Sequence, residues 1–248
     1  EPDNRERPSV YLGIPSFRST AGFRCWRGAA GAACIAQAAA RECAKEPGRD
    51  QLKECWQKLA SDWRIKQLQY SWIRAITKSH TNFWEVTKDG LDFALDANNL
   101  SNDQELRERL LSLYWSLKSY PEVPKVLEKL KTNRLETAIL SNGSREMLDS
   151  AVQSAKISEL LDKILSVDQV KIFKPDFRVY NLVLESFPRD KNEILFVSAN
   201  GWDVASAAGF GFKSVWVNRN SEPIDRLPWK PKHVLTNLTD IPKLTKTI

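Results

Sequence analysis

Three short polar segments follow apolar runs in the second half of the chain, and their side chains could carry out hydrolysis. They are residues 141–144 after "TAIL", 174–175 after "VKIF" and 198–203 after "ILFV". Together they supply an ammonium, Lys174, and a carboxylate, Asp203, among hydroxyl and amide groups. Such a set can organise a charged nucleophile and a water, and backbone N–H groups at helix starts can bind an anion.

Each of these groups also has a structural explanation when taken alone. Ser141 could simply help to start the next helix, and a lysine before proline is usually a surface residue. Asp203 could be an acid matched to the dipole of a helix start, and Trp202 could be a core residue. The functional interpretation depends on all three segments occurring in order along one alternating pattern.

From about residue 136 onward, short apolar runs alternate with helix-period segments. This alternation predicts an α/β fold with a Rossmann-like parallel sheet and right-handed crossovers. Ligands bind such sheets at the carboxyl ends of the strands, where the polar segments lie. The expected strands are "ETAILSN", "LDKILSV", "EILFVSA", "KSVWVNR" and "HVLTNLTDI".

The pattern before residue 119 is different. Residues 51–118 form three helix-period segments rich in aromatic residues, and we interpret them as a helical cap inserted into the core. The core then comprises residues 1–50, with an aberrant beginning, and residues 119–248. The Ala-rich stretch 27–43 is the part closest to low complexity.

Composition narrows the classes of function. The 248 residues carry 37 basic and 31 acidic side chains, a net charge of +6, and the basic residues are interleaved with acids. This favours a solvated surface with no nucleic-acid partner. No apolar run is long enough for a membrane span, and the first residues do not resemble a signal peptide. The four cysteines, Cys25, Cys34, Cys43 and Cys55, lack zinc-site spacing and are expected to be reduced in a cytoplasmic protein.

The motifs in combination resemble the haloacid dehalogenase superfamily, and within it the L-2-haloacid dehalogenases. The resemblance covers roughly residues 40–240. The segments that carry it are "LSNGSREML", "KIFKPDFRVY", "FVSANGWDVASAAGFGFKSVWVNR", "DWRIKQLQYSWIR" and "NFWEVTKDGLDFAL". It implies a hydrolase that removes halide from short L-2-haloalkanoic acids through an aspartyl ester and yields D-2-hydroxy acids.

The resemblance also implies catalytic roles. Lys174 would orient the nucleophile, Tyr180 would support it by hydrogen bonding, and Arg64 in the cap would receive the halide. A guanidinium suits this last role because it is always charged and weakly hydrated.

Three further residues, Ser198, Asn200 and Asp203, would orient Lys174 and the hydrolytic water. Phosphatases of the superfamily usually carry two acids in the last motif to hold Mg²⁺, which prefers oxygen ligands. Here Ser198 and Asn200 are neutral, so the sequence predicts a site with no metal and no other cofactor.

The substrate would be held by Ser141 and Asn142 at its carboxylate and halide, and by Leu68, Phe83 and Trp202 around its alkyl part. The resemblance also implies a homodimer, for which the cap tryptophans Trp72, Trp84 and Trp115 offer apolar surface. A superfamily phosphatase and an inactive relative that only binds anions remain alternative interpretations.

The first motif of the family is missing. It has the form Phe-Asp-x-Tyr-Gly-Thr-Leu-Phe-Asp, and its first Asp is the nucleophile, but this chain has no Asp between Asp3 and Asp50. Because Pro15 would remove a hydrogen-bond donor from a ladder, we expect that "VYLGIPSF" forms no proper central strand. Either the chain is a natural inactive relative, or this stretch is read in a shifted frame, which we favour.

The shifted-frame hypothesis makes a prediction about the gene. Codons for Phe23-Arg24-Cys25 can be written so that reading one base later gives Phe-Asp-Val, the end of the missing motif. Nucleotide sequencing across codons 10–40 should therefore reveal Phe-Asp in a shifted frame. If every frame lacks it, the chain is a natural relative without the motif.

Overall fold

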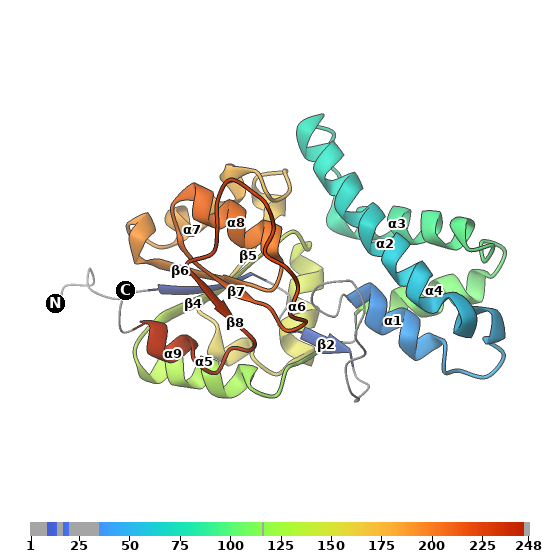
Figure 1. The fold of residues 1–248 in the computed structure, drawn as a ribbon, viewed down its shortest axis with the longest axis horizontal. Coiled ribbons are helices and arrows are strands. Elements are labelled where there is room, and N and C mark those ends of the chain that lie inside the picture. The colour runs from blue at the N-terminus through green and yellow to red at the C-terminus, as the bar shows by residue number, and fades with distance from the viewer. Residues whose placement is uncertain (1–8, 14–16, 20–34, 116, 246–248) are drawn as a thin grey trace.

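A parallel sheet flanked by helices forms one half of the molecule, and a group of helices forms the other (Figure 1). The computed structural model describes residues 9–13, 17–19, 35–115 and 117–245. The sheet has six strands in the order β5-β4-β1-β6-β7-β8, and every pairing is parallel. Its strands are β1 (Ser9–Gly13), β4 (Glu136–Ser141), β5 (Lys163–Ser166), β6 (Ile194–Ser198), β7 (Lys213–Val217) and β8 (His233–Leu235). The predicted α/β fold and all five strands expected after residue 136 are confirmed.

Helices cover both faces of the sheet because its strands are apolar on both sides. Ile139 and Val197 pack on the face covered by α5, α6 and α9, and Leu140 and Phe196 pack on the face covered by α7 and α8. Full burial of one such side chain stabilises the fold by about 1.5–3 kcal/mol. The helices are α5 (Val123–Thr132), α6 (Arg145–Ser154), α7 (Phe177–Ser186), α8 (Gly201–Phe210) and α9 (Ile241–Leu244), with short 3-10 turns η1 (Ser158–Leu160), η2 (Val167–Gln169) and η3 (Lys191–Glu193).

The expectation for the first strand was wrong. β1 lies at the centre of the sheet, where Gly13 is in register with Leu140 of β4 and Leu12 with Val197 of β6. The strand is only five residues long and ends at Gly13, so the ladder ends before Pro15 and needs no hydrogen-bond donor at that position. Pro15 itself lies outside the described residues.

The cap is built on α2 (Asp50–Ile76), which packs along α3 (Phe83–Ala97), with α4 (Gln104–Tyr114) beside them. Trp63 of α2 is fully buried, and its indole N–H donates to the Thr87 carbonyl at 2.8 Å. Side-chain caps begin the two later helices, with Asn82 accepting from the Glu85 N–H and Asp103 from the Leu106 N–H.

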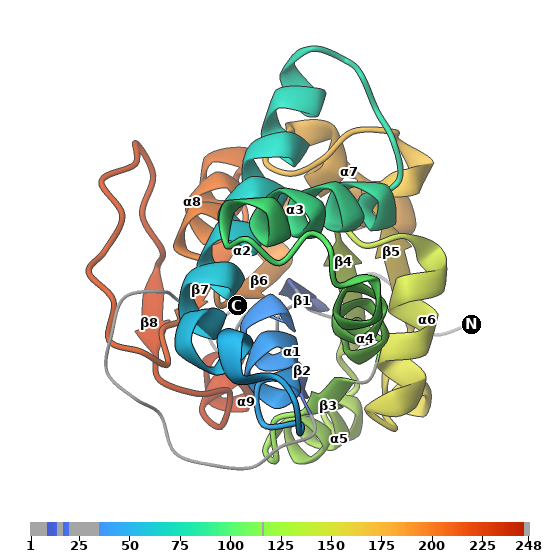
Figure 2. The same cartoon turned by 90° about the vertical axis from the view of Figure 1, so that its right-hand side faces the viewer.

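One cap helix was not predicted. α1 (Ile35–Cys43) comes from the Ala-rich stretch and packs its alanines and the buried Cys43 against α2 and α4 (Figure 2). Two short strands, β2 (Phe17–Ser19) and β3 (Leu117–Ser119), pair antiparallel. The chain therefore leaves the sheet toward the cap and returns from it along neighbouring paths.

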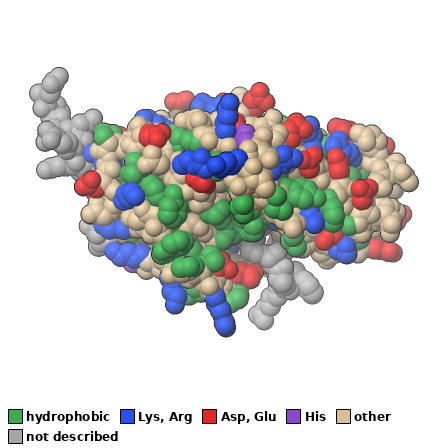
Figure 3. All heavy atoms as spheres, turned by 90° about the horizontal axis from the view of Figure 1, so that it is seen from above, with side chains coloured by type: hydrophobic (Ala, Val, Ile, Leu, Met, Phe, Trp, Pro, Cys, Tyr) green, Lys and Arg blue, Asp and Glu red, His purple; other side chains and the backbone are tan. Residues whose placement is uncertain are grey.

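The charged surface, the helices and two of the four cysteines can be compared with what the sequence predicts. Basic and acidic side chains are interspersed over the face in Figure 3. Within the described ranges, no helix is both long enough and apolar enough to span a membrane. Cys43 and Cys55 are free thiols, and burial raises the pKa of Cys43 to about 11. Cys25 and Cys34 lie outside the described residues.

Close packing of α2 on α3 generates a stability prediction. A Cβ at Gly90 would lie 3.2 Å from the Trp63 carbonyl oxygen and 3.2 Å from the Gln67 nitrogen, both backbone atoms. Gly90→Val should therefore lower the free energy of unfolding by about 1–3 kcal/mol, measured by urea denaturation. The control is Asp96→Val at an exposed position of the same helix. Equal effects of the two substitutions would contradict this account.

Candidate active site

Lys174 is the centre of the candidate site, at the carboxyl ends of β4 and β6. Its side chain is almost completely buried, and Nζ donates to the Leu140 carbonyl at 3.0 Å and to Asp203 Oδ2 at 3.1 Å. The rings of Phe196 and Tyr180 lie 4.9 and 5.7 Å from Nζ. A buried ammonium needs both an opposite charge and acceptors, and Asp203 and Leu140 supply them.

Asp203 joins the other predicted groups into one network. Its Oδ2 accepts from Lys174 and from Ser198 Oγ at 3.0 Å, and its Oδ1 accepts from the Tyr180 hydroxyl at 2.8 Å. It lies in the first turn of α8, where the helix dipole favours a negative charge. The structure therefore brings Lys174, Tyr180, Ser198 and Asp203 into direct contact.

The network perturbs the ionisation of its members. Burial lowers the pKa of Lys174, and the nearby Asp203 carboxylate opposes that shift. Burial raises the pKa of Tyr180 well above its usual value, and the Asp203 charge adds to the effect. Tyr180 is therefore a neutral hydrogen-bond donor at ordinary pH.

The turn after β4 is held to the same network. Asn142 Oδ1 accepts from the Lys174 backbone N–H at 2.9 Å, and Ser141 Oγ accepts from the Gly143 N–H at 3.0 Å. Ser166 Oγ donates to the Gly143 carbonyl at 2.8 Å and fixes the turn from β5. The Asn142 amide Nδ2 donates no hydrogen bond to another described residue.

Arg64 links the cap to the sheet. Its Nη2 donates to Asn200 Oδ1 at 3.4 Å, and its Nη1 donates to Gln67 Oε1 at 2.9 Å. Gln67 is buried and donates in turn to Thr87 Oγ1 of α3 at 2.8 Å. The Asn200 N–H donates to Ser198 Oγ at 3.2 Å, so hydrogen bonds run from Arg64 to Asp203.

The three expected pocket residues lie in different settings. Trp202 is half-buried, and its ring meets that of Trp72 on α2 edge-on at 5.6 Å. Phe83 is a core residue with its ring 5.9 Å from that of Phe173, the residue before Lys174. Leu68 is half-buried on α2, one turn beyond Arg64.

Three groups that contact the site residues were not predicted from the sequence. The Leu140 carbonyl could not be singled out from the sequence, because every residue has a backbone carbonyl. Phe196 was read only as part of a strand, although its ring flanks Lys174. Gln67 could have been found, because it follows Arg64 by three positions on a helix and therefore shares its face.

No carboxylate follows β1. The register places Gly13 beside Leu140, whose carbonyl binds Lys174, so the chain leaves β1 close to this lysine. The sequence contains no Asp or Glu between Glu6 and Glu42. In the described part of the chain, no three His, Cys, Asp or Glu side chains are grouped so that they could hold a metal ion.

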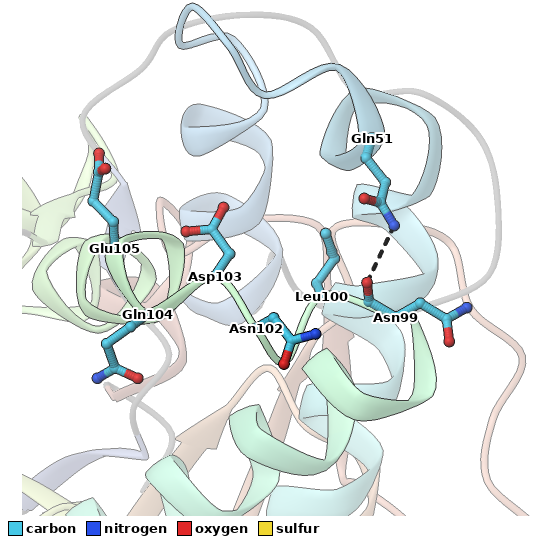
Figure 4. A pocket seen from close by; sticks show the side chains of 7 residues that line it. All are labelled: Gln51, Asn99, Leu100, Asn102, Asp103, Gln104 and Glu105. Carbon is cyan, nitrogen blue, oxygen red and sulfur yellow. Dashed lines mark hydrogen bonds between the residues drawn. The ribbon is translucent and has the colours of Figure 1, made fainter.

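A cavity on the cap is separate from this site. It has a volume of about 470 Å³ and lies between the start of α2 and the α3–α4 connection, where Gln51 donates to the Asn99 carbonyl (Figure 4). Its two carboxylates, Asp103 and Glu105, are both bound by Arg49. None of the predicted site residues lines it.

The Lys174–Asp203 pair predicts how stability depends on pH. Because the pKa of Lys174 is lower in the folded state than in the unfolded chain, the unfolded chain binds more protons between the two values, and stability rises with pH there. Asp203→Asn removes the opposing attraction, so this window should extend to lower pH. It should also cost about 3–5 kcal/mol near neutral pH, since a buried charge loses its partner.

The measurement is the free energy of unfolding by urea from pH 6 to 9.5, below the range in which Tyr180 would ionise. The variant should show a steeper rise than the parent protein. The control is Lys174→Met combined with Asp203→Asn, which should have no such rise. Equal slopes in the single variant and the parent would contradict the assignment.

Comparisons with known proteins agree with this geometry. The family model for haloacid dehalogenase-like hydrolases matches residues 20–211. The chain is 40% identical over 190 residues to (S)-2-haloacid dehalogenase 1 of Pseudomonas sp. (strain CBS-3), which is 77% of this chain and 84% of that relative. It is also 40% identical to (S)-2-haloacid dehalogenase 4A of Burkholderia cepacia, over 75% of this chain and 81% of that one.

Solved structures are similar over nearly the whole chain. A dehalogenase in complex with an intermediate is 32% identical, with a TM-score of 0.83 and 97% of both chains covered. The L-2-haloacid dehalogenase of Xanthobacter autotrophicus with chloropropionic acid covalently bound is 27% identical, with a TM-score of 0.81 and 98% and 99% of the chains covered. The family match, the relatives and the α/β core with its helical cap together establish that this chain belongs to the haloacid dehalogenase-like hydrolases.

Proposed function

We propose that the protein removes halide from short L-2-haloalkanoic acids and forms D-2-hydroxy acids at the Lys174 site, with no metal. The observation that carries the proposal is the buried network of Lys174, Asp203, Ser198 and Tyr180, linked by hydrogen bonds to the cap guanidinium of Arg64. The relatives named above act on haloacids, and their resemblance supports this substrate class.

The proposed reaction has two displacements at different atoms. A carboxylate attacks C2 of the haloacid, and the halide leaves with the bonding electrons toward Arg64. Water then attacks the carboxyl carbon of the ester, so C2 is inverted only once and the L acid yields the D product. Asn142 and the turn after β4 would hold the substrate carboxylate, with Trp202 beside its alkyl group.

Asp203 is not the carboxylate that attacks C2 in this mechanism. Asp203 already accepts hydrogen bonds from three side chains and neutralises Lys174, so it is committed to orientation. The chain offers no carboxylate between Glu6 and Glu42. An anion-binding relative without turnover is therefore the second candidate function.

A phosphatase is less well supported. Ser198 and Asn200 are neutral, and both are engaged in hydrogen bonds, so the turn offers Asp203 as its one carboxylate for a hard cation. Mg²⁺-dependent release of phosphate would revive this candidate.

We propose a cytoplasmic homodimer that uses the cap surface. Trp84 and Trp115 pack on each other at 4.9 Å and Trp72 packs on Trp202, so these rings are half-buried. The exposed side chains of Ile65, Ile73, Ile76 and Phe93 give the cap further apolar surface.

The proposed function predicts enantioselective chloride release. Protein verified by intact mass, in EDTA and with no added metal, should release chloride from L-2-chloropropionate and none from the D form. Arg64→Leu should lower the rate by about a hundredfold, because the leaving halide loses its cation. The control is Arg74→Leu, which removes a surface pair with Asp89. If the protein binds the L acid but releases no chloride, the anion-binding function is correct instead.

A further inference from the structure

The guanidinium of Arg64 is held by two amide oxygens. Its Nη1 donates to Gln67 Oε1 at 2.9 Å, and its Nη2 donates to Asn200 Oδ1 at 3.4 Å. Within the part of the chain that the structure describes, Arg64 forms no ion pair, whereas Arg107 on α4 is bound through Nε and Nη2 by the Asp92 carboxylate. An amide oxygen orients a guanidinium without cancelling its charge, so the charge of Arg64 stays available to an anion.

The amide of Gln67 is itself fixed by Thr87 of α3, and both side chains are almost completely buried. The Thr87 hydroxyl donates its single hydrogen to the Phe83 carbonyl at 2.7 Å. Its oxygen can therefore only accept from the Gln67 amide, 2.8 Å away. The amide group that faces Thr87 must be Nε2, so Oε1 is the atom that faces Arg64.

The close approach of α2 to α3 keeps these hydrogen bonds in place. The indole N–H of Trp63 donates to the backbone carbonyl of Thr87 at 2.8 Å. One turn further along α3, a Cβ at Gly90 would lie only 3.2 Å from the backbone nitrogen of Gln67. The acceptor for Arg64 Nη1 is thus anchored in the core of the cap.

We propose that Thr87 and Gln67 are positioning residues that orient the guanidinium of Arg64 toward the departing halide without neutralising it. This inference rests on the proposed function. Both residues act through Arg64, whose long side chain has several rotatable bonds. Their hydrogen bonds restrict it to one orientation, and a misplacement of about 1 Å in such a group can lower a rate about a hundredfold.

The first test is the dependence of the rate on the leaving halide. Thr87→Val removes the acceptor for Gln67 Nε2, so the amide can turn this donor toward Arg64. The value of kcat/KM with L-2-chloropropionate should then fall about tenfold. The fall with L-2-bromopropionate should be smaller, because bromide is the better leaving group and needs less help from a cation. Damage to the fold would lower both values by the same factor, so their ratio reports the position of Arg64.

Two variants are the controls for this ratio. Thr87→Ser retains the hydroxyl and should keep the ratio of the parent protein. Thr132→Val removes a hydroxyl on α5 that donates to the carbonyl four residues earlier, as Thr87 does on α3, and should also keep it.

Chloride binding gives a second readout, which does not depend on turnover. The protein broadens the ³⁵Cl NMR line of sodium chloride, and the part of the broadening that is lost in Arg64→Leu is assigned to Arg64. Thr87→Val should lose most of this part. Gln67→Glu should lose all of it, because a carboxylate beside the guanidinium would cancel its charge. Retention of this part in Gln67→Glu would contradict the requirement for a neutral acceptor.

The two readouts separate this inference from the proposed function. If the parent protein releases halide, an unchanged ratio in Thr87→Val overturns the positioning role and leaves dehalogenation standing. If the parent protein releases none, the proposed function fails and the ³⁵Cl line decides. Loss of the Arg64 part in Thr87→Val then supports the positioning role in an anion-binding protein, and an unchanged part, or no such part in the parent protein, overturns it.

Discussion

The buried pair of Lys174 and Asp203 is the interaction on which the arrangement of the site depends. An ammonium with almost no exposure is stable only beside an opposite charge, so the end of β4 and the start of α8 must stay at hydrogen-bond distance from it. The same carboxylate fixes Tyr180 and Ser198, and the Lys174 backbone fixes Asn142. Three polar turns from distant parts of the sequence are thereby held at one edge of the sheet.

Much of the fold could be predicted because buried parallel strands are short apolar runs. Strands β4 to β8 followed from that pattern. β1 could not be predicted, because it is defined by pairing with β4 and β6, which are far away in sequence. α1 was missed because its alanines were read as low complexity, although Ala is the strongest helix former.

The residues of the site were easier to predict from the sequence than their arrangement in space. Side-chain types and motif order identified Lys174, Asp203 and Ser198, and the family resemblance added Tyr180. The structure brings all four into contact. Arg64 was placed in the cap, but its link to Asn200 depends on how the cap docks, which no local pattern contains. Phe83 was expected in the pocket and packs against Phe173, because an aromatic residue at a helix start can face either way.

The paired strands β2 and β3 have a mechanical consequence. Both passages between sheet and cap run through this one narrow ribbon of three residues per strand. This ribbon is separate from the six-stranded sheet, so a displacement of the cap about it would leave that sheet intact. Rocking the cap away would separate Arg64 from Asn200 and Trp72 from Trp202. Any such displacement would therefore open the site and withdraw the cap guanidinium from it together.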